Sequence, residues 1–374
     1  MNTARRGLWL LLLWPLIGFA HKPSDSYLMF DLDGTTLAGQ WDIALRDLEY
    51  AIGLDADQDG VITWGELQAR HLAIAQYALA RLKIGRAGQA CVLQPIQHLV
   101  DNHSDGAYAV LRFTSSCATD QPLTVDYRLF FDLDPSHRGL LRIVRGSTTE
   151  TAVLGPAQST IELKPSARGP WATLADFWRE GVWHIAIGFD HVLFVLSLLL
   201  PSVLWRANGR WREAESLRAV MLDVAAIITA FTVAHALTLS AAVLGWIHLP
   251  SRWVEAAIAA TVVLAALNNL YPVVHGRRWL VAFGFGLVHG LGFASTLADM
   301  NLPGGALALA LVGFNLGVES GQFIIVAILL PAAFVLRDSW FYRRIALQTG
   351  SLTVAAIASL WLVERGLNLK LITP

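Results

Sequence analysis

The sequence predicts a small antiparallel β-domain with a helical insertion, exported from the cytoplasm and followed by an all-α domain of six transmembrane helices. Two observations support this prediction. Of the 374 residues, 55% are hydrophobic and only 15% are charged, whereas about 25% of a soluble domain is charged. The hydrophobic residues are also unevenly distributed, because residues 21–170 have an ordinary polar composition and residues 181–365 consist of hydrophobic runs with short breaks.

Residues 1–20 are expected to be a secretory signal peptide. Two arginines precede the run "GLWLLLLWPLIG", which is too short to span a bilayer comfortably, and Gly18 and Ala20 are the small residues of a cleavage site. An uncleaved membrane anchor is the alternative. Both interpretations place residues 21–180 on the outer side of the membrane, which is the periplasm in a Gram-negative host.

The exported part, residues 21–170, has the pattern of a β-domain. Several segments alternate polar and hydrophobic residues as strands do, and a helical insertion at about 46–83 separates the second from the third. Cys91 and Cys117 are the only cysteines in the chain. Because an oxidising compartment permits disulfides, we expect these two residues to be bonded to each other.

The centre of the insertion, "DADQDGVITWGE" at residues 55–66, matches the twelve-residue calcium loop of an EF-hand. Such a loop supplies oxygen ligands at positions 1, 3, 5, 7, 9 and 12, and needs a glycine at position 6, which is Gly60 here. The insertion is therefore predicted to be EF-hand-like and to bind a structural Ca²⁺, with a solvated acidic turn as the alternative. The expected calcium ligands are Asp55, Asp57, Asp59, Val61, Thr63 and Glu66.

Residues 171–374 are expected to cross the membrane six times, in spans near the ~20 residues that the hydrocarbon core requires. Nine arginines lie in the loops that would face the cytoplasm, and only three basic residues lie in the outer loops and tail. This bias agrees with the signal peptide. It predicts an inner (plasma) membrane protein whose N-terminal domain and C-terminus are periplasmic. The spans are placed at about 183–204, 219–246, 254–274, 279–299, 306–334 and 345–364.

Several of these spans carry ionisable or amide side chains, which are costly in a bilayer and by default indicate a functional site. At ~1.5 Å per residue, those of four helices lie at nearly one depth in the outer half of the bilayer. Imidazole combined with carboxylate suits a divalent transition metal such as Ni, Co or Zn. Interhelical hydrogen bonding is the alternative for each histidine taken alone. The expected metal ligands are His184, Asp190, His191, His235, His289, Asn315 and Glu319.

Two details refine this site. His184 is expected to lie two helical turns nearer the outside than His191, and therefore to be the entry ligand. Glycines flank His289 on both sides, and small residues let transmembrane helices approach closely. We therefore expect the backbone at His289 to lie close to the span that it faces.

Four segments of the spans carry motifs of a known family: H-x5-D-H at 184–191, "FTVAHALTLS" at 231–240, "HGLGFAS" at 289–295 and "FNLGVESGQ" at 314–322. Together they resemble the HupE/UreJ family of hydrogenase and urease accessory membrane proteins, and more narrowly its branch with a long exported N-terminal domain. The resemblance covers about 180–365.

This family is described as nickel/cobalt permeases, and the resemblance implies that the histidines and aspartate of the first motif bind the metal. The family's second motif has the form F-H-G-x-A-x-E. Here its histidine is His289, Val288 stands in place of the Phe, and no Glu follows in the same span. Glu319, from the fifth span, is the candidate replacement.

Three functions are open on these observations. The first is a permease for a nickel- or cobalt-type ion. The second is an intramembrane zinc metallohydrolase acting on a lipid or a membrane peptide, in which Asp190 or Glu319 would be the general base for a zinc-bound water. The third is a non-catalytic assembly or sensor protein. The expected partners are a metal ion and membrane lipid, and the net charge of −1 gives no reason to expect nucleic acid.

Overall fold

The computed structural model describes residues 24–33, 36–86, 89–103, 106–116, 122–145, 148–163, 170–207, 210–274, 276–300 and 302–367. The predicted signal peptide and Cys117 lie outside the described residues, so the signal peptide and the disulfide remain predictions. The chain divides into two compact units. Among the described residues, one unit comprises those up to residue 177 together with 295–313, and the other comprises 178–294 and those from residue 314 on.

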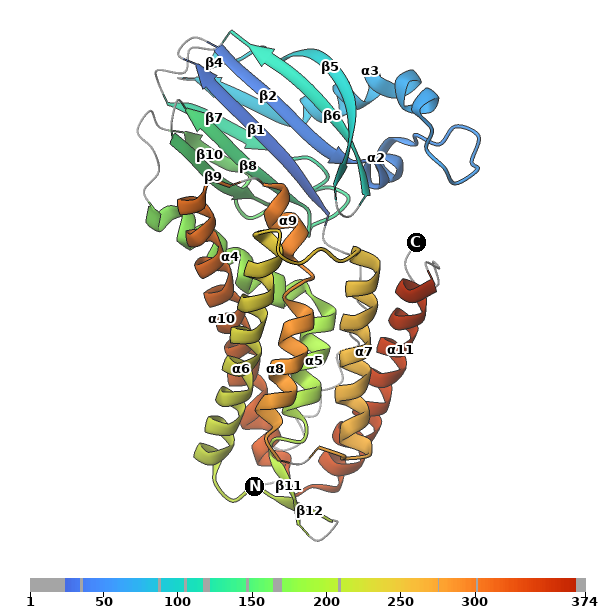
Figure 1. Cartoon of the computed structure of the whole chain (residues 1–374), viewed down its shortest axis with the longest axis vertical. Coiled ribbons are helices and arrows are strands. Elements are labelled where there is room, and N and C mark those ends of the chain that lie inside the picture. Colours follow the sequence, from blue (N-terminus) through green and yellow to red (C-terminus); the bar gives the residue numbers. More distant parts are fainter. Residues whose placement is uncertain are drawn as a thin grey trace, which may run out of the picture. The chain divides into compact units, whose positions relative to one another are not determined.

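The first unit is β-rich, as predicted, and contains two sheets (Figure 1). The larger sheet has the order β5 (Gln94–His103), β6 (Gly106–Ser115), β2 (Thr36–Ala44), β1 (Asp25–Asp33), β8 (Arg138–Arg145) and β9 (Thr148–Leu154). The smaller sheet has the order β10 (Thr160–Leu163), β7 (Leu123–Tyr127), β3 (Leu82–Arg86) and β4 (Gln89–Ala90).

The larger sheet differs from the prediction in one respect, because β1 and β8 pair in parallel. The long stretch of chain between these strands allows β8 to return in the same direction as β1, whereas the short connection between β1 and β2 imposes an antiparallel pair. Side chains of both sheets form one hydrophobic core, in which Trp41 lies 5.5 Å from Tyr127 between ring centroids.

Helices α2 (Leu45–Ile52) and α3 (Trp64–Ala80) form the insertion between β2 and β3. Each helix anchors itself in the β core with a buried leucine, Leu48 and Leu67. Thr63 caps α3, since its side chain accepts a hydrogen bond from the backbone of Glu66 and the Glu66 side chain bonds back to Thr63. The loop between the helices is therefore fixed at both ends.

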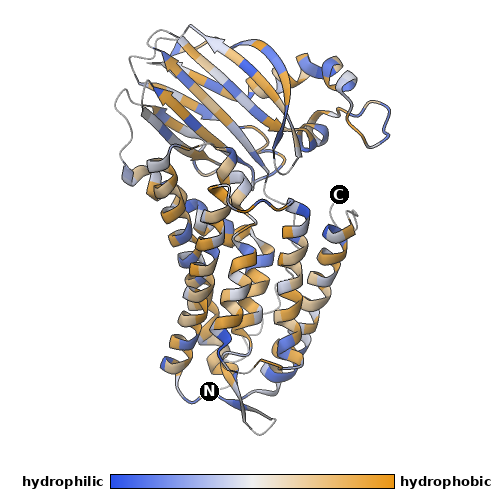
Figure 2. Ribbon diagram, in the orientation of Figure 1, coloured by the Kyte–Doolittle hydropathy of each residue, from blue (hydrophilic) through white to orange (hydrophobic). Residues whose placement is uncertain are grey.

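The second unit is helical, as predicted, and Figure 2 shows hydrophobic residues along its helices. Many of these residues, including Val233, Leu264 and Ile328, are exposed, as in helices that face lipid. Three helices, α4, α9 and α10, contain a boundary between the two units. The elements of this part of the chain are α4 (Pro170–Ile187), α5 (Phe189–Leu199), β11 (Leu204–Ala207), β12 (Arg210–Glu213), α6 (Leu217–Val243), α7 (Ser251–Leu270), α8 (Arg278–His289), α9 (Ala294–Asp299), α10 (Gly304–Leu336), a π-helix at Tyr342–Thr349 and α11 (Gly350–Leu367).

Four helical segments of the described chain are long and apolar enough to cross a membrane: Leu217–Val243, Ser251–Leu270, Gly304–Leu336 and Tyr342–Leu367. Helices α4 and α5 make a fifth if they count as one span, although they are bent by 73°. The predicted span at 279–299 is two short helices, α8 and α9, because the chain turns at Gly290–Phe293. The structure thus supports a membrane protein, and six complete spans stay a prediction.

Helices α6 and α8 lie side by side at very close range (Figure 1). A Cβ atom at Gly286 would collide with the carbonyl oxygen of Phe231, and one at Gly290 would collide with that of His235. The close approach expected beside His289 is confirmed, and it requires glycine at both positions.

Candidate metal site

The first motif lies at a break between two helices rather than within one helix. Helix α4 ends at Ile187, α5 begins at Phe189, and a Cβ atom at Gly188 would lie 2.7 Å from both the carbonyl oxygen of His184 and Nδ1 of His191. Only glycine leaves room for this arrangement. Broken helices of this kind form the ion sites of several transporter families.

The break places Asp190 and His191 in the first turn of α5. Oδ1 of Asp190 accepts hydrogen bonds from the backbone nitrogen and from Nδ1 of His191, both at 2.9 Å. Its other oxygen lies 3.8 Å from Arg365 of α11. A carboxylate suits a helix N-terminus because it complements the helix dipole. In the neutral tautomer whose Nδ1 donates to Asp190, the lone pair lies on Nε2. This atom is buried and has no partner among the described residues.

His235 on α6 resembles His191, because one ring nitrogen bonds to a side chain and the other has no partner among the described residues. Its Nδ1 lies 3.1 Å from Oδ1 of Asn315 on α10, so the side chains of two helices meet at this point. Its Nε2 is buried, and the described part of the chain offers it no hydrogen bond. The amide therefore orients the imidazole and leaves Nε2 available to a ligand.

His289, at the end of α8, is the third such residue. Its Nε2 lies 2.8 Å from Oγ1 of Thr261 on α7. The Thr261 hydroxyl donates its own proton to the carbonyl oxygen of Ile258 at 2.6 Å, so it accepts a proton from His289. The lone pair of His289 is consequently on Nδ1, which is buried and unpaired within the described residues.

His184 joins this group because of the bend at Gly188. Its ring centroid lies 4.7 Å from that of His191, which in turn lies 5.2 Å from that of His289. The bend brings these two rings together, which counting along the sequence did not predict, and the role of His184 as the entry ligand stays a prediction. The four histidines, from α4, α5, α6 and α8, are called the histidine cluster below.

Of the other predicted ligands, Asn315 contacts the histidine cluster and Glu319 does not. Oε1 of Glu319 accepts a hydrogen bond from Thr229 at 2.8 Å, and no described histidine pairs with it. The structure adds Thr261 and Arg365, which the sequence analysis did not select. A threonine hydroxyl in a transmembrane helix usually donates a hydrogen bond to a backbone carbonyl of the same helix. Arg365 was counted only among the basic residues of the outer loops and tail. Neither residue type in that position indicates a metal site.

Neutral imidazoles with free lone pairs fit a borderline divalent metal. Their arrangement is open, however. Within the described chain, the ligand atoms of three His, Cys, Asp or Glu residues approach within 4.8 Å of one another only at Asp55, Asp57 and Asp59. Coordination of one ion by three rings of the histidine cluster therefore requires those rings to rotate inward.

The predicted calcium loop brings its first three carboxylates together. The backbone nitrogen of Gly60 donates to Asp55 at 2.8 Å and that of Val61 donates to Asp59 at 2.7 Å, and Gly60 has a φ of 85°, which favours glycine. Hydrogen bonds from the backbone and side chain of Thr63 and from other backbone amides lower the pKa of Glu66 to about 2. The carboxylate at position 12 is therefore ionised at neutral pH.

The helices and the histidine cluster define a helical membrane protein with a candidate site for a metal ion. A family model described as HupE / UreJ protein matches residues 160–365, which is more than half of the chain. The chain belongs to the HupE/UreJ family, and the match contains the whole histidine cluster. No curated protein matches the sequence significantly.

Proposed function

We propose that the protein is a permease for a nickel- or cobalt-type divalent ion and that the histidine cluster holds the ion in transit. The observation that carries this proposal is the set of three buried, unpaired imidazole nitrogens on His191, His235 and His289. A buried polar atom without a partner costs about 1–3 kcal/mol. Each of the three lies on a ring that a neighbouring side chain holds from its other side, and a ligand shared by the rings would explain all of them.

The open arrangement of the rings favours transport over tight, permanent binding, because a transported ion must also be released. The hydrolase alternative needs a carboxylate free to act as a base beside the metal. Asp190 is engaged by His191 and Arg365, and Glu319 by Thr229. Neither of the two carboxylates named as candidate bases is therefore free beside the cluster.

Uptake and binding by the full-length protein test this proposal together. The protein is reconstituted in liposomes that contain a Ni²⁺-sensitive dye, and Ni²⁺ binding is measured in detergent. His191→Ala should abolish uptake and weaken binding at least ~10-fold. The matched control is His248→Ala, which changes an exposed histidine outside the cluster and should behave as the wild type.

The outcomes separate the candidate functions. Stoichiometric binding that depends on His191 without any uptake would overturn the permease and favour a hydrolase, a sensor or an assembly protein. Binding that His191→Ala does not change would remove the histidine cluster as the metal site.

We also propose that the chain crosses the inner membrane six times, with α4 and α5 forming one broken span and the α8–α9 region another. The N-terminal domain and the C-terminus are then periplasmic. The supporting observation is the excess of arginine in three alternate loops. Reporter fusions that are active only in the periplasm should be active after Pro250 and inactive after Glu215. The opposite pattern would reverse the topology.

The loop at residues 55–66 is proposed to bind Ca²⁺ as an EF-hand. The proposal is supported by the complete set of ligand positions, by the left-handed backbone at Gly60 and by the short distances between Asp55, Asp57 and Asp59. Single extracellular sites of this type bind weakly, at about 10⁻⁴–10⁻³ M. Calorimetric titration of the full-length protein should show such a site, which Glu66→Gln removes and Glu162→Gln, on the exposed side of β10, does not. Equal binding by both variants would disprove the assignment.

A further inference from the structure

Two phenylalanines lie on one side of the histidine cluster along the helices that carry it. Phe194 follows His191 by three residues on α5, and Phe231 precedes His235 by four residues on α6. Helix α5 runs away from the break and α6 begins after the hairpin that follows it, so both rings are displaced toward the same end of the bundle, by about 4.5–6 Å. This end, where α6 begins, is called the inner end below.

The two rings close the histidine cluster on this side. Their centroids are 5.1 Å apart, and they lie 5.1 and 5.2 Å from that of His289. Phe231 also lies 6.1 Å from His235. Both phenylalanines are 1% exposed. An ion that leaves the cluster toward the inner end therefore meets two buried hydrophobic rings.

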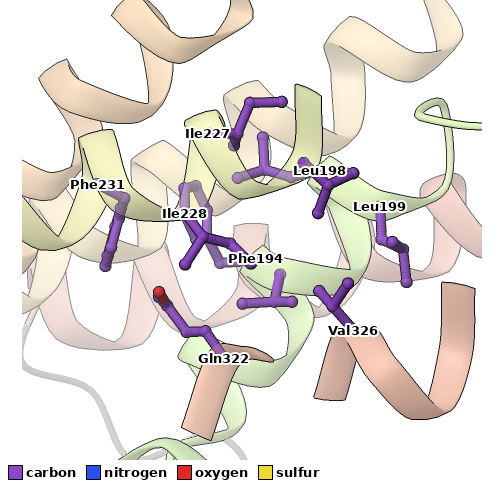
Figure 3. Close-up of a pocket in the computed structure, with 10 residues that line it drawn as sticks. Phe194, Leu198, Leu199, Ile227, Ile228, Phe231, Gln322 and Val326 are labelled. Atoms are coloured by element: carbon purple, nitrogen blue, oxygen red, sulfur yellow. The ribbon is translucent and has the colours of Figure 1, made fainter. Parts of the chain in front are cut away.

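A cavity lies directly behind these rings (Figure 3). Its volume is about 20 Å³, which is room for about one water molecule. It is lined by Phe194, Phe231 and hydrophobic residues of α5, α6 and α10, and Gln322 is the polar residue among the described residues of the lining. In Figure 3 the amide of Gln322 extends toward Phe231. The side-chain oxygen of Gln322 also accepts a hydrogen bond from Thr232 at 3.4 Å.

A second aromatic pair covers the opposite side of the cluster. The rings of Phe293, just beyond the end of α8, and Phe314, on α10, are stacked with centroids 4.2 Å apart. They lie 5.2 and 5.3 Å from the ring of His184. The histidine cluster thus has a pair of phenylalanine rings packed against it on each of two sides.

We infer that Phe194 and Phe231 are the inner gate of the permease. The cavity at Gln322 is then the first polar site that the ion reaches beyond this gate. This inference rests on the proposed transport function. A constriction of hydrophobic side chains excludes water and ions until it widens. The Gln322 oxygen is a neutral ligand that can receive the ion without retaining it. Opening the two aromatic pairs in turn provides alternating access to the histidine cluster.

Changes of gate size test the inference in the Ni²⁺-uptake assay. Phe194→Ala widens the gate and should raise the initial rate of uptake at least ~3-fold, and Phe231→Trp narrows it and should lower the rate at least ~3-fold. Both variants retain the histidines, so their Ni²⁺ dissociation constants should stay within ~2-fold of the wild type. The matched control is Phe285→Ala, since Phe285 packs on Phe194 at 5.8 Å without lining the cavity, and it should transport at the wild-type rate.

The gate and the permease can fail separately. If the wild type takes up Ni²⁺ and both gate variants do so at its rate, the gate is overturned and the permease stands. If the wild type binds Ni²⁺ but transports none, both are overturned. A change of rate in Phe285→Ala equal to that in Phe194→Ala would also overturn the gate, because the effect would then belong to general packing.

Discussion

Nδ1 of His191 lies 2.9 Å from Oδ1 of Asp190, and the two residues are the second and third of a helix that begins at a break in the bundle. The carboxylate fixes the tautomer and the orientation of the ring, and it leaves Nε2 free to bind a ligand. Asp190, which precedes His191 in the sequence, thus orients the imidazole of His191.

The first prediction concerns this pair. Asp190→Asn keeps the shape of the side chain and removes its charge, so Nε2 of His191 becomes a weaker ligand. Affinity for Ni²⁺, measured by equilibrium dialysis, should fall about 10- to 100-fold. The control is Asp223→Asn, which alters an exposed ion pair with Arg278 and should leave the affinity unchanged. Undiminished binding by Asp190→Asn would show that the ring does not depend on this carboxylate.

The second prediction concerns the break itself. Gly188→Ala forces a Cβ atom against the carbonyl oxygen of His184 and the ring of His191, both at 2.7 Å. The break should shift, and Ni²⁺ binding should be lost even in folded, monodisperse protein. Gly284→Ala is the control, because no described atom lies within 4 Å of the added carbon. Normal binding by the Gly188 variant would mean that the cluster tolerates a different bend.

The third prediction concerns a histidine of the β-rich unit. Nε2 of His103 lies 3.2 Å from Asp42, and its Nδ1 lies 3.3 Å from Asp299. Burial on its own lowers the pKa of His103, but the two neighbouring carboxylates, Asp299 and Asp42, outweigh it and raise the pKa to about 9. The folded state therefore holds this proton more tightly than the unfolded chain does, where the pKa is about 6.5.

This ion pair should stabilise the fold fully below about pH 6.5, and the stabilisation should disappear as the pH rises through 9. The loss is on the order of 1–2 kcal/mol with solvent screening included, or about 3–6 °C in melting temperature. His103→Gln should flatten the dependence of melting temperature on pH. His71→Gln, which alters a ring bonded to the backbone oxygen of Gln68, should preserve it. Equal slopes in the wild type and His103→Gln would refute the assignment.

The fourth prediction concerns calcium. If the loop at residues 55–66 binds Ca²⁺ only when folded, a tenfold excess of Ca²⁺ over its dissociation constant stabilises the protein by about 1.4 kcal/mol. Chelation should therefore lower the melting temperature of the full-length wild type. Glu66→Gln should melt at the same temperature with and without Ca²⁺. A wild type that is insensitive to chelation would contradict the proposal.

Helix and strand patterns are local, and for this reason much of the architecture was predictable. The alternation of residues in "AYAVLRF" predicts β6, and long hydrophobic runs predict α6, α7 and α10. The parallel pairing of β1 with β8 was not predictable, because it depends on the path of the chain across more than a hundred residues. The span at 279–299 was predicted as one helix because hydrophobicity alone does not reveal the turn after His289.

The sequence by itself determined that this is a membrane protein with an N-terminal β-rich region, and it picked out the histidines within the hydrophobic runs as candidate ligands, since both follow from local composition. Only the tertiary structure decided how those rings are used. The bend at Gly188 brings His184 beside His191. Asn315 and Thr261, from other helices, direct the free nitrogens of His235 and His289, while Glu319 turns to Thr229. The physical reason is that bends and the rotation of helices about their axes depend on packing between helices, which counting along one chain does not contain.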